Sequence, residues 1–247
     1  MLNMQDLVGT LMQGVLAGSS HGRIAHALSG RGLSRPGGVF EQVLGGATSG
    51  TGTGTGGLLS GLGALASALV GGGRSATKEA LGGGAMALLG SLALEALRGL
   101  RHPSTDDVSA AVPADLPLGL RPPANTDEES ELESKARVIL RAMINAAKAD
   151  GQIDDAEQQR ILGKLAEADV AATVQAFVRA EMGRPLDLKA LLREVPNPQM
   201  AAEVYAASLL AMEVDTPAER DYLRQLAQGL GLDEGAVQRL HLTLGVI

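Results

Sequence analysis

The sequence contains no cysteine and no tryptophan, and only two phenylalanines and two tyrosines among its 247 residues. Disulfide bonds, thiolate zinc sites and catalysis by a thiol are therefore excluded. A hydrophobic core must be built from leucine, alanine, valine and methionine rather than from aromatic side chains. Apolar and polar residues also do not alternate over any stretch long enough to require a β-sheet. The expected fold class is therefore all-α.

The motifs of common enzyme classes are absent as well. The sequence has no Gly-x-Ser-x-Gly elbow, dinucleotide fingerprint or histidine-based metal motif, and its Gly-rich runs lack the Lys-Ser/Thr pair of a phosphate-binding loop. Carboxylates could perform acid–base chemistry if their environments separated their pKa values, but nothing in the sequence indicates such a separation. We therefore expect a protein that is not an enzyme, with a carboxylate-based hydrolase as a remote alternative.

Two different compositions meet near residue 126. Residues 1–126 hold 26 of the 33 glycines together with 8 Lys/Arg and 7 Asp/Glu, whereas residues 127–247 hold 13 Lys/Arg and 21 Asp/Glu. An acidic C-terminal half argues against nucleic acid as a partner, because binding to phosphate groups requires a basic face.

The first 56 residues are expected to form one helix and one linker. Leu7, Leu11 and Val15 recur at helical spacing, so residues 1–17 are predicted to form an amphipathic helix. This helix would lie on a membrane or pack against another helix. Residues 18–56 are rich in glycine, serine and threonine, a composition that favours a flexible linker.

Residues 57–100 are predicted to form Gly-rich, apolar helical segments. Their small residues would let helices approach closely within lipid, which favours membrane association. A spanning helix needs roughly 20 mostly apolar residues, and the two uncharged runs reach that length only by including a Thr-Gly repeat or Glu95. A marginal span or hairpin, an interfacial segment and a soluble helical pair all stay open. The Pro-rich residues 101–128 are predicted to be a second linker and the domain boundary.

The densest set of spaced acidic residues lies at 149–157, between two helical runs. Gly151 can end the first helix, and Asp154 stands three residues before Glu157, which is the spacing of a capping box. The acidic side chains offer the hard oxygen ligands that calcium or magnesium requires. A lysine, Lys148, takes the place of the third ligand of an EF-hand loop, so a standard EF-hand is excluded. The alternative is that the carboxylates only cap a helix.

A similar acidic turn, at residues 213–219, follows the next long helical run. Thr216 and Glu219 have capping-box spacing, and Pro217 stands at the first helical position. Two units of helix, acidic turn and helix suggest an internal pseudo-repeat whose turns face each other and hold a divalent cation, such as Ca²⁺. The predicted metal ligands are Asp150, Asp154, Asp155, Glu157, Glu213, Asp215 and Glu219.

These two turns, together with the Gly-Leu-Gly-Leu motif at 229–232, carry a family resemblance. Residues 129–247 resemble the TerB-like (tellurite-resistance) helical domain and, more closely, the YebE-like family of uncharacterised bacterial inner-membrane proteins. The resemblance implies a compact bundle of about six or seven helices with an acidic surface able to bind a divalent metal. It brings no known reaction, and Glu213 stands where an aspartate would be expected.

The sequence therefore leads to two expectations for function. The first is a non-enzymatic, membrane-associated protein of the bacterial inner membrane, with a cytoplasmic C-terminal domain that binds a divalent cation or a basic partner, or that self-associates. Such a protein would be linked to metal or envelope stress. The second is a soluble cytoplasmic scaffold whose acidic turns are helix caps only. Further helix caps are predicted at Asp169, Asp187, Asn197 and Asp233.

Overall fold

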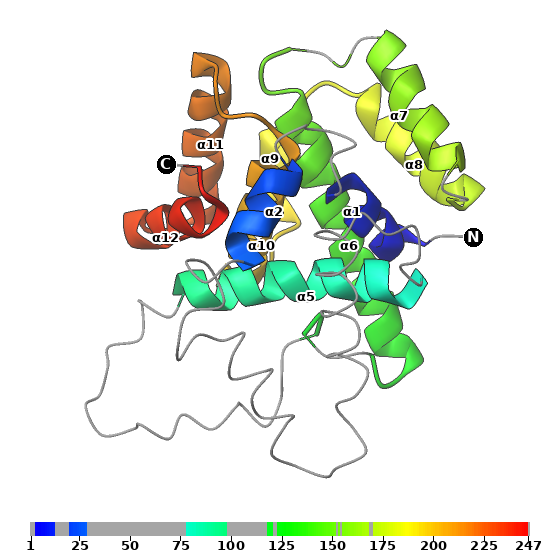
Figure 1. The fold of residues 1–247 in the computed structure, drawn as a ribbon, viewed down its shortest axis with the longest axis horizontal. Helices are drawn as coiled ribbons and strands as arrows, with labels where there is room; N and C mark the ends of the chain where they lie inside the picture. Colours follow the sequence, from blue (N-terminus) through cyan, green and yellow to red (C-terminus); the bar gives the residue numbers. More distant parts are fainter. Residues whose placement is uncertain are drawn as a thin grey trace.

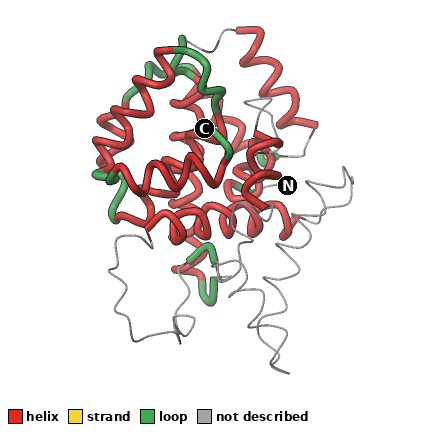
Figure 2. Tube along the Cα trace, turned by 60° about the vertical axis from the view of Figure 1, so that its left-hand side comes forward, coloured by secondary structure: helices red, strands yellow, loops and turns green. Residues whose placement is uncertain are grey.

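The computed structural model describes residues 3–12, 20–28, 78–97, 118–120, 123–151, 153, 155–167 and 170–246. Within these ranges the regular secondary structure is entirely helical, which confirms the predicted all-α class (Figures 1 and 2). The described helices are α1 (Met4–Met12), α2 (Ser20–Leu28), α5 (Lys78–Leu97), α6 (Thr126–Ala147), α7 (Asp155–Glu167), α8 (Ala172–Met182), α9 (Leu188–Arg193), α10 (Pro198–Ala211), α11 (Pro217–Leu230) and α12 (Glu234–Leu244).

Helix α10 is the centre of the bundle. All but its first two residues are buried, and they are mainly alanine, leucine and valine. A helix that is apolar on every side must be surrounded by other helices, and α10 contacts α1, α2, α5, α6, α11 and α12. In Figure 1, α5 runs across one side of the bundle, while α7 and α8 form a pair away from α11 and α12.

Helix α1 belongs to the same core as the C-terminal helices. Leu7, Val8 and Leu11 are fully buried in one hydrophobic cluster that also includes residues of α5, α6 and α10. The helix begins with a reciprocal cap, in which Asn3 and Asp6 each accept a hydrogen bond of 3.0 Å from the other's backbone N–H. The N-terminal helix therefore packs inside the fold, which is the second of its two expected roles.

The predicted linker 18–56 requires a correction at its start. Ser20–Leu28 form helix α2, and Ile24 and Ala27 are buried in its contacts with α10 and α12. A helix of nine residues is not stable in isolation, so the local sequence alone does not indicate this one. Tertiary contacts with helices that lie 186 to 217 residues further along the chain therefore stabilise this segment. The rest of the predicted linker lies outside the described residues.

Helix α5 confirms the helical prediction for part of residues 57–100. Met86, Leu89 and Leu92 are buried in the core that α5 shares with α1, α10 and α12. Among the described helices, none is both long enough and apolar enough to cross a membrane. Residues 57–77 and 98–100 lie outside the described part.

The end of the predicted Pro-rich linker 101–128 requires a correction, because α6 already begins at Thr126. Leu120 packs on α5, where the position of a Cβ at Gly90 would lie 3.1 Å from its Cγ. Asn125 then caps α6 by accepting a hydrogen bond of 2.9 Å from Glu128 N–H. Residues 118–120 therefore pack against α5 before the chain enters α6.

Most of the predicted caps in the C-terminal half are confirmed. Asp187, Asn197 and Asp233 accept hydrogen bonds from the first turns of α9, α10 and α12. Asp169 was wrongly predicted as a cap, because α8 begins after Ala171 and has no side-chain cap. Gly231 ends α11 in the left-handed conformation, with a φ of 67°.

Candidate functional site

The second acidic turn is organised around the carboxylate of Glu219. This side chain is buried, and its Oε2 accepts hydrogen bonds from Asp215 N (3.1 Å), Thr216 N (2.9 Å) and Thr216 Oγ1 (2.8 Å). Thr216 Oγ1 accepts one from Glu219 N in return, at 3.2 Å. The predicted capping box is therefore confirmed. Glu213 and Asp215 remain exposed on the surface of the same turn.

A cation that the sequence did not reveal faces this turn. Arg23 of α2 donates hydrogen bonds to the carbonyl oxygens of Leu209 and Met212, the latter at 2.6 Å. It therefore satisfies carbonyl groups that the end of α10 leaves open. Burial lowers the pKa of Arg23, while the negative charges of Glu213 and Glu219 oppose that shift. A permanent positive charge thus already stands beside two of the predicted metal ligands.

The first acidic turn is only partly described. Asp150 is exposed, and the side chains of Asp154, Asp155 and Glu157 lie outside the described residues. Among the described residues, no three His, Asp or Glu side chains are grouped as metal ligands, and no hydrogen bond or ion pair joins Asp150 to the second turn. The divalent-cation site therefore stays a prediction.

Lys148, which interrupts the EF-hand pattern, has a structural role. It is 4% exposed, and its Nζ donates hydrogen bonds to the carbonyl oxygens of Glu181 (2.5 Å) and Arg184 (2.6 Å). Burial lowers the pKa of Lys148, and the charge of Glu181 opposes this effect. The lysine therefore joins the end of α6 to the end of α8.

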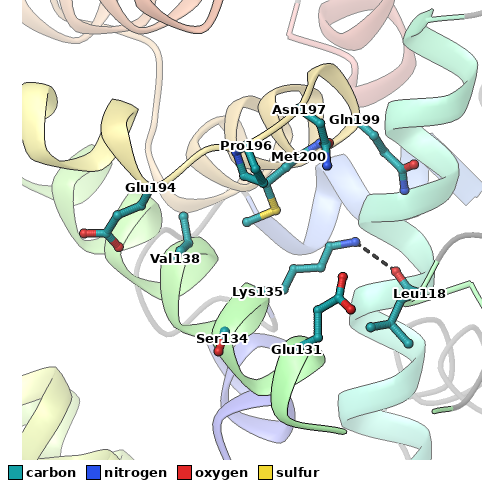
Figure 3. Close-up of a pocket in the computed structure, with 10 residues that line it drawn as sticks. All are labelled: Leu118, Glu131, Ser134, Lys135, Val138, Glu194, Pro196, Asn197, Gln199 and Met200. Carbon is teal, nitrogen blue, oxygen red and sulfur yellow. Dashed lines mark hydrogen bonds between the residues drawn. The ribbon is translucent and has the colours of Figure 1, made fainter. Parts of the chain in front are cut away.

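A cavity of about 320 Å³ lies between α6 and the connection from α9 to α10. Figure 3 shows the side chain of Met200 directed toward Val138, and Leu118 is a further apolar lining residue on the other side of Lys135. The rim carries carboxylate, hydroxyl and amide groups. The lining residues are Leu118, Glu131, Ser134, Lys135, Val138, Glu194, Pro196, Asn197, Gln199 and Met200.

The charge of Lys135 is already matched within the protein. Its Nζ donates hydrogen bonds to Leu118 O (2.9 Å) and to Glu203 Oε1 (2.8 Å), and Glu203 is fully buried. Gln199 Nε2 donates to the same oxygen at 3.1 Å. Glu203 Oε2 lies 2.7 Å from Nζ but accepts no well-aligned hydrogen bond. Burial raises the pKa of Glu203, and Lys135 opposes that shift.

A second ionic network fixes the opposite rim of the cavity. The guanidinium group of Arg141 pairs with both oxygens of Glu181, at 3.2 and 3.1 Å, and also with Glu194. Arg184 donates to Glu181 at 2.8 Å, and Phe177 lies 5.9 Å below the Arg141 guanidinium. Helices α6, α8 and α9 are therefore held together where Glu194 reaches the cavity.

Tyr205 and His241 form a pair inside the bundle. The Tyr205 hydroxyl and His241 Nε2 lie 2.9 Å apart, and the two rings stack with centroids 5.9 Å apart. Burial raises the pKa of Tyr205 to about 12. Burial also lowers the pKa of His241, and the charge of Arg23 adds to this effect. Tyr205 is 2% exposed, so its ring packs inside the bundle.

Comparison with known proteins gives a family but no activity. The family described as "Protein of unknown function (DUF533)" matches residues 48–244. A relative from Yersinia enterocolitica, described as "Uncharacterized protein in ampR 5'region", is 27% identical over 112 residues, which cover 45% of this chain and 81% of the relative. No solved structure matches. Because the family match spans more than half of its length, the chain belongs to the DUF533 family.

Proposed function

We propose that this protein is a non-enzymatic, TerB-like interaction module that holds a segment of a partner protein in the cavity between α6 and the α9–α10 connection. The observation that carries the proposal is the cavity itself, whose lining combines the apolar side chains of Leu118, Val138 and Met200 with several polar groups. Binding sites generally combine an apolar lining with a few placed polar groups.

The rigidity of the walls supports a binding role. Lys135 is tied to Leu118 and Glu203, and Arg141 is tied to Glu181 and Glu194. A preformed site loses little conformational entropy when a ligand binds. The chemical groups of the lining also favour binding over catalysis, because Ser134 has no histidine beside it in the lining and Lys135 is already paired.

The TerB-like assignment and the links to tellurite, metal or envelope stress rest on the resemblance of the two acidic turns and the Gly-Leu-Gly-Leu motif. The inner-membrane location rests on the same resemblance. We retain the divalent-cation site formed by the two acidic turns as a separate proposal, to be tested by the thermal stability of the full chain with added Ca²⁺ or Mg²⁺. A bound cation at about 100 times its Kd would add roughly 2.7 kcal/mol to stability.

The partner-binding proposal can be tested with a photo-crosslinking amino acid placed in the full chain. Ser134 is exposed at the cavity and is the test position, and Gln238 is exposed on α12 and is the matched control. We expect a discrete protein adduct in cells at Ser134 and not at Gln238. The same adducts at both positions, or none at Ser134 in a folded variant, would contradict the proposal.

A further inference from the structure

The size of the cavity limits what part of a partner can enter it. A volume of about 320 Å³ is at the lower end for ligand sites, whereas an α-helix with its side chains is about 10–12 Å across. The cavity therefore accepts one or two side chains of a partner rather than a whole helix. Its wall of Leu118, Val138, Pro196 and Met200 favours an apolar side chain, and the flexible methionine can adapt to its shape.

The charge at the base of the cavity disfavours an anionic ligand. Lys135 is the cation in the lining, and its Nζ is shared between Leu118 O and the carboxylate of Glu203. A carboxylate or phosphate entering the cavity would compete with Glu203 for this cation and would draw Nζ away from it. It would then leave Glu203, which is fully buried, without its counter-ion.

The charge at the rim instead favours a cation on the side where α6 begins. Glu131 is exposed at the cavity and has no hydrogen bond or ion pair to any described residue. Asp127 and Glu129 are exposed in the preceding turn, so this end of α6 is strongly acidic. On the opposite rim, Glu194 is already paired with Arg141. Among the described residues, the rim carboxylate that no ion pair holds is therefore Glu131, on the α6 side.

We infer that the cavity receives a basic protein segment in which an apolar side chain enters between Val138 and Met200 and an adjacent lysine or arginine pairs with Glu131. The inference deepens the proposed function and rests on it, because it names the chemistry of the bound segment. Complementary charge at the rim would set the orientation and specificity of this segment.

Three short peptides test the inference by NMR titration of the full-length protein. They share a glycine-flanked core of Arg-Leu-Arg, Arg-Ser-Arg or Glu-Leu-Glu. We expect the Arg-Leu-Arg peptide to bind at least about tenfold more tightly than the other two, to shift signals of Val138 and Met200, and to bind more weakly as salt is added. Equal affinities for the three peptides would overturn the inference.

Two charge-matched variants separate the local contact from the net charge of the protein. Glu131→Gln should weaken Arg-Leu-Arg binding several-fold, while Asp221→Asn, an exposed change on α11, should leave it unchanged. Circular dichroism checks that both variants remain folded. Wild-type affinity in Glu131→Gln, or equal losses in both variants, would contradict the inference. If Ser134 crosslinks to a partner while the peptides show no selectivity, the proposed function stands and the basic class of the partner is wrong.

Discussion

At the scale of single residues, Glu219 illustrates how one carboxylate can satisfy several backbone groups. Its Oε2 accepts hydrogen bonds from two backbone N–H groups and one hydroxyl. The carboxylate also interacts electrostatically with the positive charge of Arg23. A carboxylate at the start of a helix is also favoured by the helix dipole. These contacts give Glu219 a structural role that does not require a metal ion.

We expect Thr216→Ala to lower the free energy of unfolding by about 1 kcal/mol, because it removes the N-cap of α11. Urea denaturation of the full chain with and without Ca²⁺ measures this loss, which should be the same in both conditions. The control is Gln225→Ala, since Gln225 is exposed on α11 and belongs neither to the cap nor to the predicted cation site. A Ca²⁺-induced gain in stability that Glu219→Gln abolishes would instead make this turn a cation site.

The buried pair of Lys135 and Glu203 gives a second prediction at this scale. Lys135→Met leaves Glu203 buried without its counter-ion, and removing one partner of such a pair costs about 3 kcal/mol or more. The double variant Lys135→Met/Glu203→Met should recover much of the loss, because an apolar pair needs no compensation. Urea denaturation of the three proteins tests this. Equal losses in the single and double variants would show that shape rather than charge matters here.

The pH dependence of the single variant has a defined sign. Burial already raises the pKa of Glu203, and removing Lys135 takes away the interaction that opposes this shift. A carboxyl group with a raised folded-state pKa stabilises the fold at low pH and loses that contribution as pH rises through the folded-state pKa. The cost of Lys135→Met should therefore be smaller at pH 5 than at pH 8.

At the scale of elements, the sequence signals differ in strength between α10 and α2. Asn197, Thr216 and Asp233 stand just before apolar periodic runs, so local chemistry predicted the starts of α10, α11 and α12. Helix α2 is short and is stabilised by its contacts with α10 and α12, which lie far along the chain, so a local pattern did not predict it. The cavity was missed for the same reason: its walls combine Leu118 with residues of α6 and of the α9–α10 connection.

The position of Arg23 of α2 near His241 of α12 predicts that acid lowers the stability of the fold. Burial and the charge of Arg23 lower the pKa of His241, so the folded state favours the neutral ring. Stability from this group is complete above the unfolded pKa of about 6.5 and is lost as pH falls through the range below it. His241→Gln should therefore lose less stability than the wild type between pH 7.5 and pH 5.5. Urea denaturation at both values, with NMR titration of the His241 ring, checks the prediction.

At the scale of the whole molecule, the change in composition near residue 126 does not separate two cores in the described part. Buried residues of α1 and α5 belong to the same hydrophobic cluster as those of α6 and α10. The composition suggested two separate parts because glycine and charge are distributed differently on either side of residue 126. Composition does not show which apolar faces pack together. The sequence therefore left open whether α1 lies on a membrane or packs against another helix.

This shared core predicts that damage to α1 destabilises the acidic C-terminal half. Leu11→Ala removes a fully buried side chain and should cost about 2–5 kcal/mol, whereas Leu242→Ala, at a leucine that is 54% exposed on α12, should change stability by less than about 0.5 kcal/mol. The protein has no tryptophan, so tyrosine fluorescence reports on Tyr205 and Tyr222 while circular dichroism reports on all helices. Both signals should move to lower urea concentration together in Leu11→Ala. An unchanged tyrosine transition would mean that α1 docks on a core that is already stable without it.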